Sequence, residues 1–292
     1  MDDFPYQLEE QYAKLFKSIF RKNTKPILSE INKILNTKVE TDADDKRPNQ
    51  TQEFKINSVL SSFGLLFISD SEKKKLANFF KILSSYSFAR AKSAVDNLKA
   101  QRTKSKKFFP QIIMDKNSRT IQDFQNSYVA FNQELVRQLG KEWIEGVSKV
   151  VKNGFVDGIG VKAIKNQLLE LDQVQASKAN FWARDQFGDA YSSFTETRFK
   201  EAGINSYIWM TSQDNRVRDT HANLHGKYFK TTDTPPGLSK PNAKLPGEDY
   251  NCRCRMMPAI DETDQLSESE RQKVINRINQ ERKNFEQPEV IQ

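Results

Sequence analysis

Residues 120–151 read TIQDFQNSYVAFNQELVRQLGKEWIEGVSKVV, and this stretch decides the fold class. Apolar side chains recur in it every three or four residues, which places them on one face of a helix. These side chains are Ile121, Phe124, Tyr128, Phe131, Leu135, Leu139, Trp143, Val147 and Val150. At 1.5 Å per residue, the predicted helix is roughly 45–50 Å long. Its apolar face needs a cover, either other helices of the chain or a partner protein.

The sequence before this stretch also favours helices joined by polar linkers. Of the eleven glycines, only one lies in the first 139 residues. Pro26 is expected to begin a short helix that runs to Leu35, and Ser69–Glu72 has the pattern of a capping box at the start of another helix. Residues 36–53 have almost no apolar content and predict a solvated linker. Residues 1–139 are therefore expected to form a helical region, either extended or bundled.

The sequence after the long helix is more varied. Residues 161–171 predict a short helix, residues 179–203 predict a longer one that ends at Gly203, and residues 207–210 predict a strand. Residues 211–258 hold both histidines, both cysteines and five of the ten prolines. The fold is therefore predicted to be mainly α with a small α+β C-terminal domain. The expected domains are residues 1–139, residues 140–260, and a polar, charged helix or tail at residues 261–292.

Composition and motifs exclude several classes of protein. The chain has 46 basic and 38 acidic residues, a formal charge of +8, and its longest apolar stretch, residues 59–68, is about half a membrane span. The phosphate-loop pattern GxxxxGK[ST], HExxH and GxSxG do not occur in it. With only two histidines, few schemes of acid–base catalysis remain. We therefore expect neither a membrane segment nor an enzyme.

Four residues have the chemistry of a metal site. His221 and His225 share a face if they lie on a helix, and Gly226 is placed to end that helix. Cys252 and Cys254 share one side of an expected strand, and they are too close in sequence for an ordinary disulfide. Two imidazoles and two thiolates suit a structural, tetrahedral Zn²⁺. The alternative is that these side chains pack and form hydrogen bonds without a metal.

Charged residues precede the first histidine. Asp214 is expected to cap the helix that carries His221, because aspartate is preferred at that position. Arg216 and Arg218 have the side chain that binds phosphate or carboxylate through two hydrogen bonds. The alternative for both arginines is solvation or a salt bridge.

Taken together, these residues resemble the phage Mu F-like head morphogenesis proteins, which are minor capsid proteins of tailed phages and prophages. The resemblance is carried by WMTSQDNRVRDTHANLHGKYF at residues 209–229 and by PGEDYNCRC at residues 246–254. The positions that match the family's pattern are Trp209, Asp214, Arg216, Arg218, His221, Gly226, Cys252, Cys254 and Pro258. It covers roughly residues 140–260, which are accordingly expected to form a Mu F-like domain.

This sequence departs from some relatives at two places. Those relatives carry C-x-x-C where this chain has Arg218 and His221, and a histidine where it has Asp249. If those positions are metal ligands in the relatives, Arg218 is not one here. His225 or Asp249 would then complete the set, so Asp249 is the reserve ligand.

The resemblance implies a low-copy virion component. Its expected partners are the portal protein, capsid or scaffold components, and phage double-stranded DNA, and its expected location is the inside of the head near the portal vertex, with the host cytoplasm during assembly. It would assist head assembly, DNA packaging or DNA exit. The alternatives are a nuclease-like enzyme that uses His221, His225 and Asp214, and a simple non-specific DNA-binding module.

A basic segment predicts where DNA would bind. Residues 90–119 carry nine basic and two acidic side chains, and Phe108 and Phe109 are placed to stack on single-stranded bases. The candidate DNA-binding residues are Arg102, Lys104, Lys106, Lys107, Lys116 and Arg119. The alternative is a solvated basic linker whose phenylalanines pack on a neighbouring helix.

Overall fold

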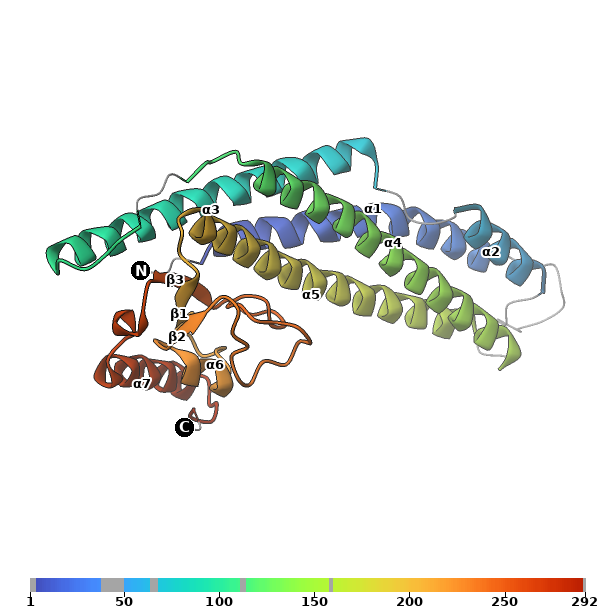
Figure 1. Cartoon of the computed structure of the whole chain (residues 1–292). Helices are drawn as coiled ribbons and strands as arrows, with labels where there is room; N and C mark the ends of the chain where they lie inside the picture. The colour runs from blue at the N-terminus through green and yellow to red at the C-terminus, as the bar shows by residue number, and fades with distance from the viewer. Residues whose placement is uncertain (1–3, 38–49, 64–67, 111–113, 158–159, 291–292) are drawn as a thin grey trace. The chain divides into compact units, whose positions relative to one another are not determined.

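The computed structural model describes residues 4–37, 50–63, 68–110, 114–157 and 160–290. Seven α-helices and one three-stranded sheet lie in these ranges (Figure 1), which confirms the predicted fold class. The helices before the sheet are α1 (Tyr6–Asn36), α2 (Gln50–Phe63), α3 (Asp70–Lys104), α4 (Arg119–Val156) and α5 (Val161–Glu201). The remaining elements are β1 (Ser206–Met210), α6 (Asp219–Leu224), β2 (Tyr228–Lys230), β3 (Arg255–Ala259), the 3₁₀ turn η1 (Glu262–Asp264) and α7 (Glu268–Asn284). None of the helices in the described ranges combines the length and the apolar character that a membrane-spanning helix needs.

The chain forms two compact units, and neither is continuous in sequence. Unit 1 combines residues 1–9, 78–127 and 184–292, whereas unit 2 combines residues 10–77 and 128–183. The helices α1, α3, α4 and α5 each contribute residues to both units. The boundaries predicted after residues 139 and 260 stay predictions.

Unit 2 has a helical core. Its largest buried side chains on α1 are Tyr12, Phe16, Ile19, Phe20, Ile27 and Ile31, and those on α4 are Val136, Leu139, Trp143 and Val147. The Tyr12 hydroxyl donates a hydrogen bond to Asn132, which joins α1 to α4. Lys178 of α5 forms an ion pair with Glu142 of α4. Most of the predicted linker at residues 36–53 lies outside the described residues, and its last four residues belong to α2.

The expectation that a helix begins at Pro26 is wrong, because Pro26 lies inside α1. A proline inside a helix removes one backbone hydrogen bond and costs about 3 kcal/mol. The apolar face continues on both sides of it, since Phe20 and Ile27 are both fully buried. Burying two such side chains contributes about 3–6 kcal/mol, which is enough to offset the proline.

The apolar face of α4 follows the helix period and departs from the predicted register in its middle. Phe131 is 47% exposed, and the buried line passes through Asn132 and Val136 instead. A near-heptad spacing drifts relative to 3.6 residues per turn, so the true face moves by one residue. Val136, Trp143 and Val147 have no exposed area. The chain therefore covers this face itself, and the face gives no support to a partner there.

The sheet of unit 1 is antiparallel, with strand order β2-β1-β3. Its centre is β1, which confirms the strand predicted at residues 207–210; Tyr207 pairs with Phe229 on one side and with Pro258 on the other. Trp209 and Tyr207 are fully buried in the same cluster as both cysteines. The sheet thus supplies one wall for the residues described below.

Helix ends follow local signals closely. Ser69 and Glu72 form the predicted capping box at the start of α3, and Ser267 and Glu270 form another at α7. Gly203 has φ +67° two residues after the end of α5, as expected for a glycine that follows a helix. The two helices expected between residues 161 and 203 are one continuous helix. No glycine or proline interrupts residues 161–187, so nothing local ends the first half.

Candidate metal site

The site begins at α6, a helix of six residues that follows an extended Arg218. Asp214 does not cap this helix, contrary to expectation, because it lies five residues before the first helical position. Its carboxylate instead accepts a hydrogen bond from the Arg216 N–H at 3.0 Å and forms an ion pair with Arg253 at 2.9 Å. The turn that leads into α6 is therefore fixed by a local aspartate turn.

His221 of α6 faces the two thiols. Its Nδ1 lies 3.4 Å from the Cys252 sulfur and 3.6 Å from the Cys254 sulfur. The three side chains are buried, and their ligand atoms all lie within 4.8 Å of one another. Around a tetrahedral zinc, with Zn–S about 2.3 Å and Zn–N about 2.0–2.1 Å, a sulfur and a nitrogen are about 3.6 Å apart. Both sulfur–nitrogen distances are therefore close to those expected around zinc.

Asp249 orients the imidazole from the other side. Its Oδ2 lies 3.0 Å from Nε2 of His221, and its Oδ1 accepts hydrogen bonds from the backbone N–H groups of Ser239, Lys240 and Tyr250. Burial opposes ionisation, but these three donors and Arg218 outweigh it and hold the pKa of Asp249 below its usual range. A carboxylate on the far nitrogen of a histidine is the usual support for a metal ligand. Donation from Nε2 to Asp249 leaves the Nδ1 lone pair directed at the thiols.

The two thiols differ in acidity. Burial acts to raise both pKa values, but the neighbouring side chains of Cys254 and His221 bring the pKa of Cys252 well below its usual range. Burial and the charge of Cys252 raise the pKa of Cys254 well above its usual range. The edge of the Trp209 ring packs on His221, with the ring centroids 5.4 Å apart. One thiolate is therefore already favoured within the protein, next to a histidine.

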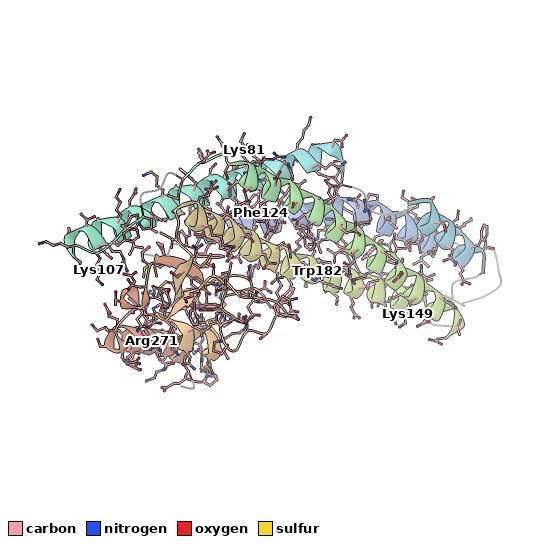
Figure 2. The ribbon with its side chains drawn as sticks, in the orientation of Figure 1. Lys81, Lys107, Phe124, Lys149, Trp182 and Arg271 are labelled. Atoms are coloured by element: carbon pink, nitrogen blue, oxygen red, sulfur yellow. The ribbon has the colours of Figure 1, made fainter. Side chains whose placement is uncertain are left out.

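The structure does not bring His225 into this group. It follows the end of α6, with φ −52° and ψ 130°, so the four-residue spacing no longer places it on the face of His221. Its Nδ1 lies 3.1 Å from the backbone nitrogen and 3.0 Å from the hydroxyl oxygen of Thr211. Burial, followed by the charges of Arg255 and of Arg271 on α7 (Figure 2), lowers the pKa of His225 to about 4. The nuclease-like grouping of His221, His225 and Asp214 is likewise not assembled, because each has different partners.

The cysteines precede the strand on which they were expected, since β3 begins at Arg255. Their loop packs closely against α5. A Cβ atom at Gly188 would lie 2.6 Å from the carbonyl oxygen of Gly247 and 3.2 Å from that of Cys252. Gly247 has φ +101°, a conformation that side chains strongly disfavour. Two glycines therefore let the loop backbone approach the helix.

A second network that holds this loop was not predicted from the sequence. Lys240 reaches Asp185 at 2.8 Å and Asp189 at 2.7 Å, and both aspartates lie on α5. Asp185 also accepts the backbone N–H of Asn251. Burial raises the pKa of Asp189 to about 7, although Lys240 opposes the shift. The spacing of the aspartates by four residues was a visible signal, but Lys240 lies 55 residues after Asp185 and 51 residues after Asp189.

The remaining motif residues lie in or beside the elements that surround the site. Gly226 has φ +76° after α6, and Pro258 lies in β3 opposite Tyr207. Arg218 forms an ion pair with Asp249 and donates to the carbonyl of Tyr250, whereas Arg216 is exposed.

The predicted DNA-binding residues are placed differently from one another. Arg102 is 4% exposed and pairs with Asp261 and Asp264 at 2.8 and 2.6 Å, so it is not available to a phosphate. Lys107, labelled in Figure 2, donates to the hydroxyl of Thr263. The exposed members of the set are Lys104, Lys106, Lys107, Lys116 and Arg119. A run of charges in sequence is therefore not one charged surface.

Comparison with known proteins places the site within one family. Residues 145–257, which include the three clustered side chains, match the family described as Phage Mu protein F like protein. This region of the chain is therefore similar to the proteins of that family. The match confirms the resemblance drawn from the sequence motifs.

Two relatives extend the comparison, and both are uncharacterized proteins. One, from Haemophilus influenzae, is 31% identical over 151 residues, which are 52% of this chain and 33% of the relative. Another, from Methanocaldococcus jannaschii, is 28% identical over 141 residues, which are 48% of this chain and 19% of the relative. The chain thus spans about a third and about a fifth of their lengths. No solved structure matches it.

Proposed function

We propose that this chain is a minor head protein of a tailed phage or prophage. In this role it associates with the portal protein and with capsid or scaffold components, and it assists head assembly, DNA packaging or DNA exit. The observation that carries the proposal is the family match over residues 145–257. The mature protein would reside inside the head near the portal vertex, after assembly in the host cytoplasm.

Portal association is tested by co-expression. The full chain is produced with the portal protein of the same phage or prophage, and the mixture is separated by gel filtration. We expect a fraction of the chain to migrate with the portal. The matched control is the same chain with an unrelated portal protein. Two species that migrate independently with the cognate portal would contradict the partnership.

Within this function, the site at α6 acts as a structural zinc site. The ligands are Nδ1 of His221 and the sulfurs of Cys252 and Cys254, which fill three of the four positions of a tetrahedral zinc. Asp249 orients His221 and does not serve as a ligand in this arrangement. Support comes from the spacing of the ligand atoms, from their burial, and from a carboxylate on the far nitrogen.

Bound zinc would link α6 to the segment that precedes β3. Between β2 and β3 the chain is a long loop of turns, so few backbone hydrogen bonds define its path. Metal binding to preformed ligands contributes directly to the folding free energy. The expected role is therefore to hold this loop on the sheet.

Elemental analysis of protein purified without chelator tests the zinc. We expect about one zinc per chain, lost in His221→Ala and in Cys252→Ser. His225→Gln is the matched control, because His225 lies outside the cluster, and it should retain the metal. Less than a few tenths of a zinc per chain, together with unchanged melting after EDTA, would contradict the site. If the single substitution His225→Gln also removes the zinc, the result would favour the four-residue ligand set predicted from the sequence.

A further inference from the structure

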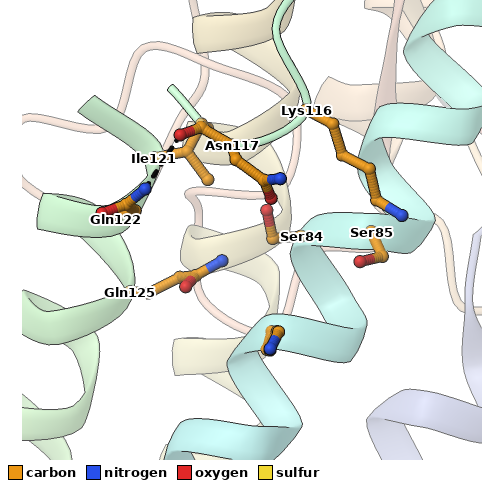
Figure 3. A pocket seen from close by; sticks show the side chains of 8 residues that line it. Ser84, Ser85, Lys116, Asn117, Ile121, Gln122 and Gln125 are labelled. Carbon is orange, nitrogen blue, oxygen red and sulfur yellow. Dashed lines mark hydrogen bonds between the residues drawn. The ribbon is translucent and has the colours of Figure 1, made fainter. Parts of the chain in front are cut away.

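A polar pocket of about 550 Å³ lies within unit 1, between α3 and the start of α4 (Figure 3). Its lining contains two lysines, Lys81 and Lys116, and no carboxylate. Most of its other lining side chains are hydroxyls and amides. Figure 3 shows the hydroxyl of Ser84 on α3 and the amide of Asn117 pointing toward one another across this space. A pocket with this lining suits an anion.

Among the residues that the structure describes, the two lysines of this pocket have no ion-pair partner, although the Asp115 carboxylate beside the pocket accepts the backbone N–H of Asn117 at 2.9 Å. The pocket also includes Gln122 and Gln125 from the first two turns of α4, a helix of 38 residues. The N-terminal end of a helix carries a partial positive charge and unpaired N–H groups. The lysines and the helix therefore add potentials of the same sign.

Buried Arg198 fixes the walls of the pocket. Its guanidinium donates to the carbonyl oxygens of Asp115 and Lys116 on one wall, and it lies 3.5 Å from the Ser84 hydroxyl on the other. Arg198 has no exposed area, so it positions these groups from beneath. The Gln122 amide donates to the Asn117 carbonyl at 2.9 Å, drawn as a dashed line in Figure 3. The segment that carries Lys116 is thus held in place before any ligand binds.

We propose that this pocket binds a phosphate group, with Lys81 and Lys116 as its charged contacts. The source is either the backbone of double-stranded DNA or free inorganic phosphate, since both present the same charged oxygens. This inference does not depend on the zinc site or on portal association. The phosphate contact is now expected at Lys81 and Lys116 of the pocket, and no longer at the lysines of residues 104–107.

Two binding measurements separate the sources. In the first, a labelled 20-base-pair duplex is titrated by fluorescence anisotropy at several salt concentrations. In the second, inorganic phosphate is titrated by calorimetry. The double variant Lys81→Gln, Lys116→Gln is compared with Lys104→Gln, Lys106→Gln, which removes the same charge from exposed positions outside the pocket.

If the ligand is DNA, the pocket variant should bind the duplex about ten-fold more weakly at 0.1 M salt. Its slope of log K against log salt should also fall by about two, because two phosphate contacts are lost. The control variant should change both quantities less. If the ligand is free phosphate, the calorimetric signal disappears only in the pocket variant, while both variants bind DNA alike.

An equal loss of duplex binding in the two variants, with no phosphate signal in the parent protein, would overturn the proposal. A second variant, Asn117→Asp, guards against misfolding of the first. It places a carboxylate in the pocket at an exposed position and should abolish the same signal. Retained phosphate and duplex binding in Asn117→Asp would also overturn the proposal.

Discussion

His225 should make the protein lose stability as the pH falls from 6.5 to 4. Its side chain is 1% exposed, and its pKa is lowered from 6.5 to about 4 by burial and by Arg255 and Arg271. In the unfolded chain it binds a proton near pH 6.5, whereas in the folded protein it stays neutral until about pH 4. The unfolded state therefore binds more protons between these values, so the stability that is present above pH 6.5 is lost on acidification.

The magnitude follows from the shift in pKa. Each unit corresponds to 1.36 kcal/mol, so a shift of about 2.5 units contributes about 3 kcal/mol once the pH has fallen through 4. The assay is urea denaturation of the parent protein and of His225→Gln at pH 7.5, 6 and 5. Carboxylates, the other histidine and any bound metal titrate in both proteins, so the difference between the two curves isolates His225.

We expect the parent to lose about 1–2 kcal/mol more than the variant between pH 7.5 and 5. The independent measurement is an NMR titration that follows the histidine ring protons, because a chain with two histidines gives only two sets of these resonances. One of them should titrate near pH 4. Parallel stability curves, with both histidines titrating above pH 6, would refute the reasoning.

Two further substitutions test the packing. Gly188→Ala should destabilise the protein by about 1–3 kcal/mol in urea denaturation, because its new methyl group meets backbone oxygens that cannot move cheaply. Gly146→Ala meets only the flexible end of Leu171 and should cost less, so an equal or smaller loss in Gly188→Ala would contradict the backbone contact. Arg102→Ala should cost about 3 kcal/mol in the same assay, because it removes the ion-pair partner of Asp264, whose side chain is only 14% exposed. An exposed pair such as Arg137 and Glu134 contributes at most about 1 kcal/mol, and a similar loss in Arg137→Ala would count against a special role for Arg102.

Local signals predicted the fold well where neighbours in sequence decide the outcome. The capping box at Ser69 and the glycine after α5 depend on a few adjacent residues, and both were visible in the sequence. The register of α4 was missed in its middle, because a polar Asn132 is buried there by a hydrogen bond from Tyr12 of α1. Such a partner, 120 residues away, leaves no trace in the local pattern.

The candidate site was predicted only in part. His221, Cys252 and Cys254 were identified by their chemistry and their scarcity, and the structure brings them together. His225 was included because its spacing assumes a longer helix than the six residues of α6. Arg102 was assigned to DNA from its neighbours in sequence, whereas its partners lie about 160 residues further on. The prediction for Arg102 failed because its partners are distant in sequence, whereas those for Pro26, Asp214 and His225 failed because helix ends were placed wrongly.

The close approach of Gly188 and Gly247 has a consequence for how this region tolerates change. The contact is made by backbone atoms, which every amino acid possesses, and it is permitted by the absence of two Cβ atoms. Loop side chains take no part in this backbone contact, whereas Lys240 holds the same loop to α5 through its own side chain. The two glycine positions tolerate almost no other residue, and the path that carries the cysteines to His221 depends on them.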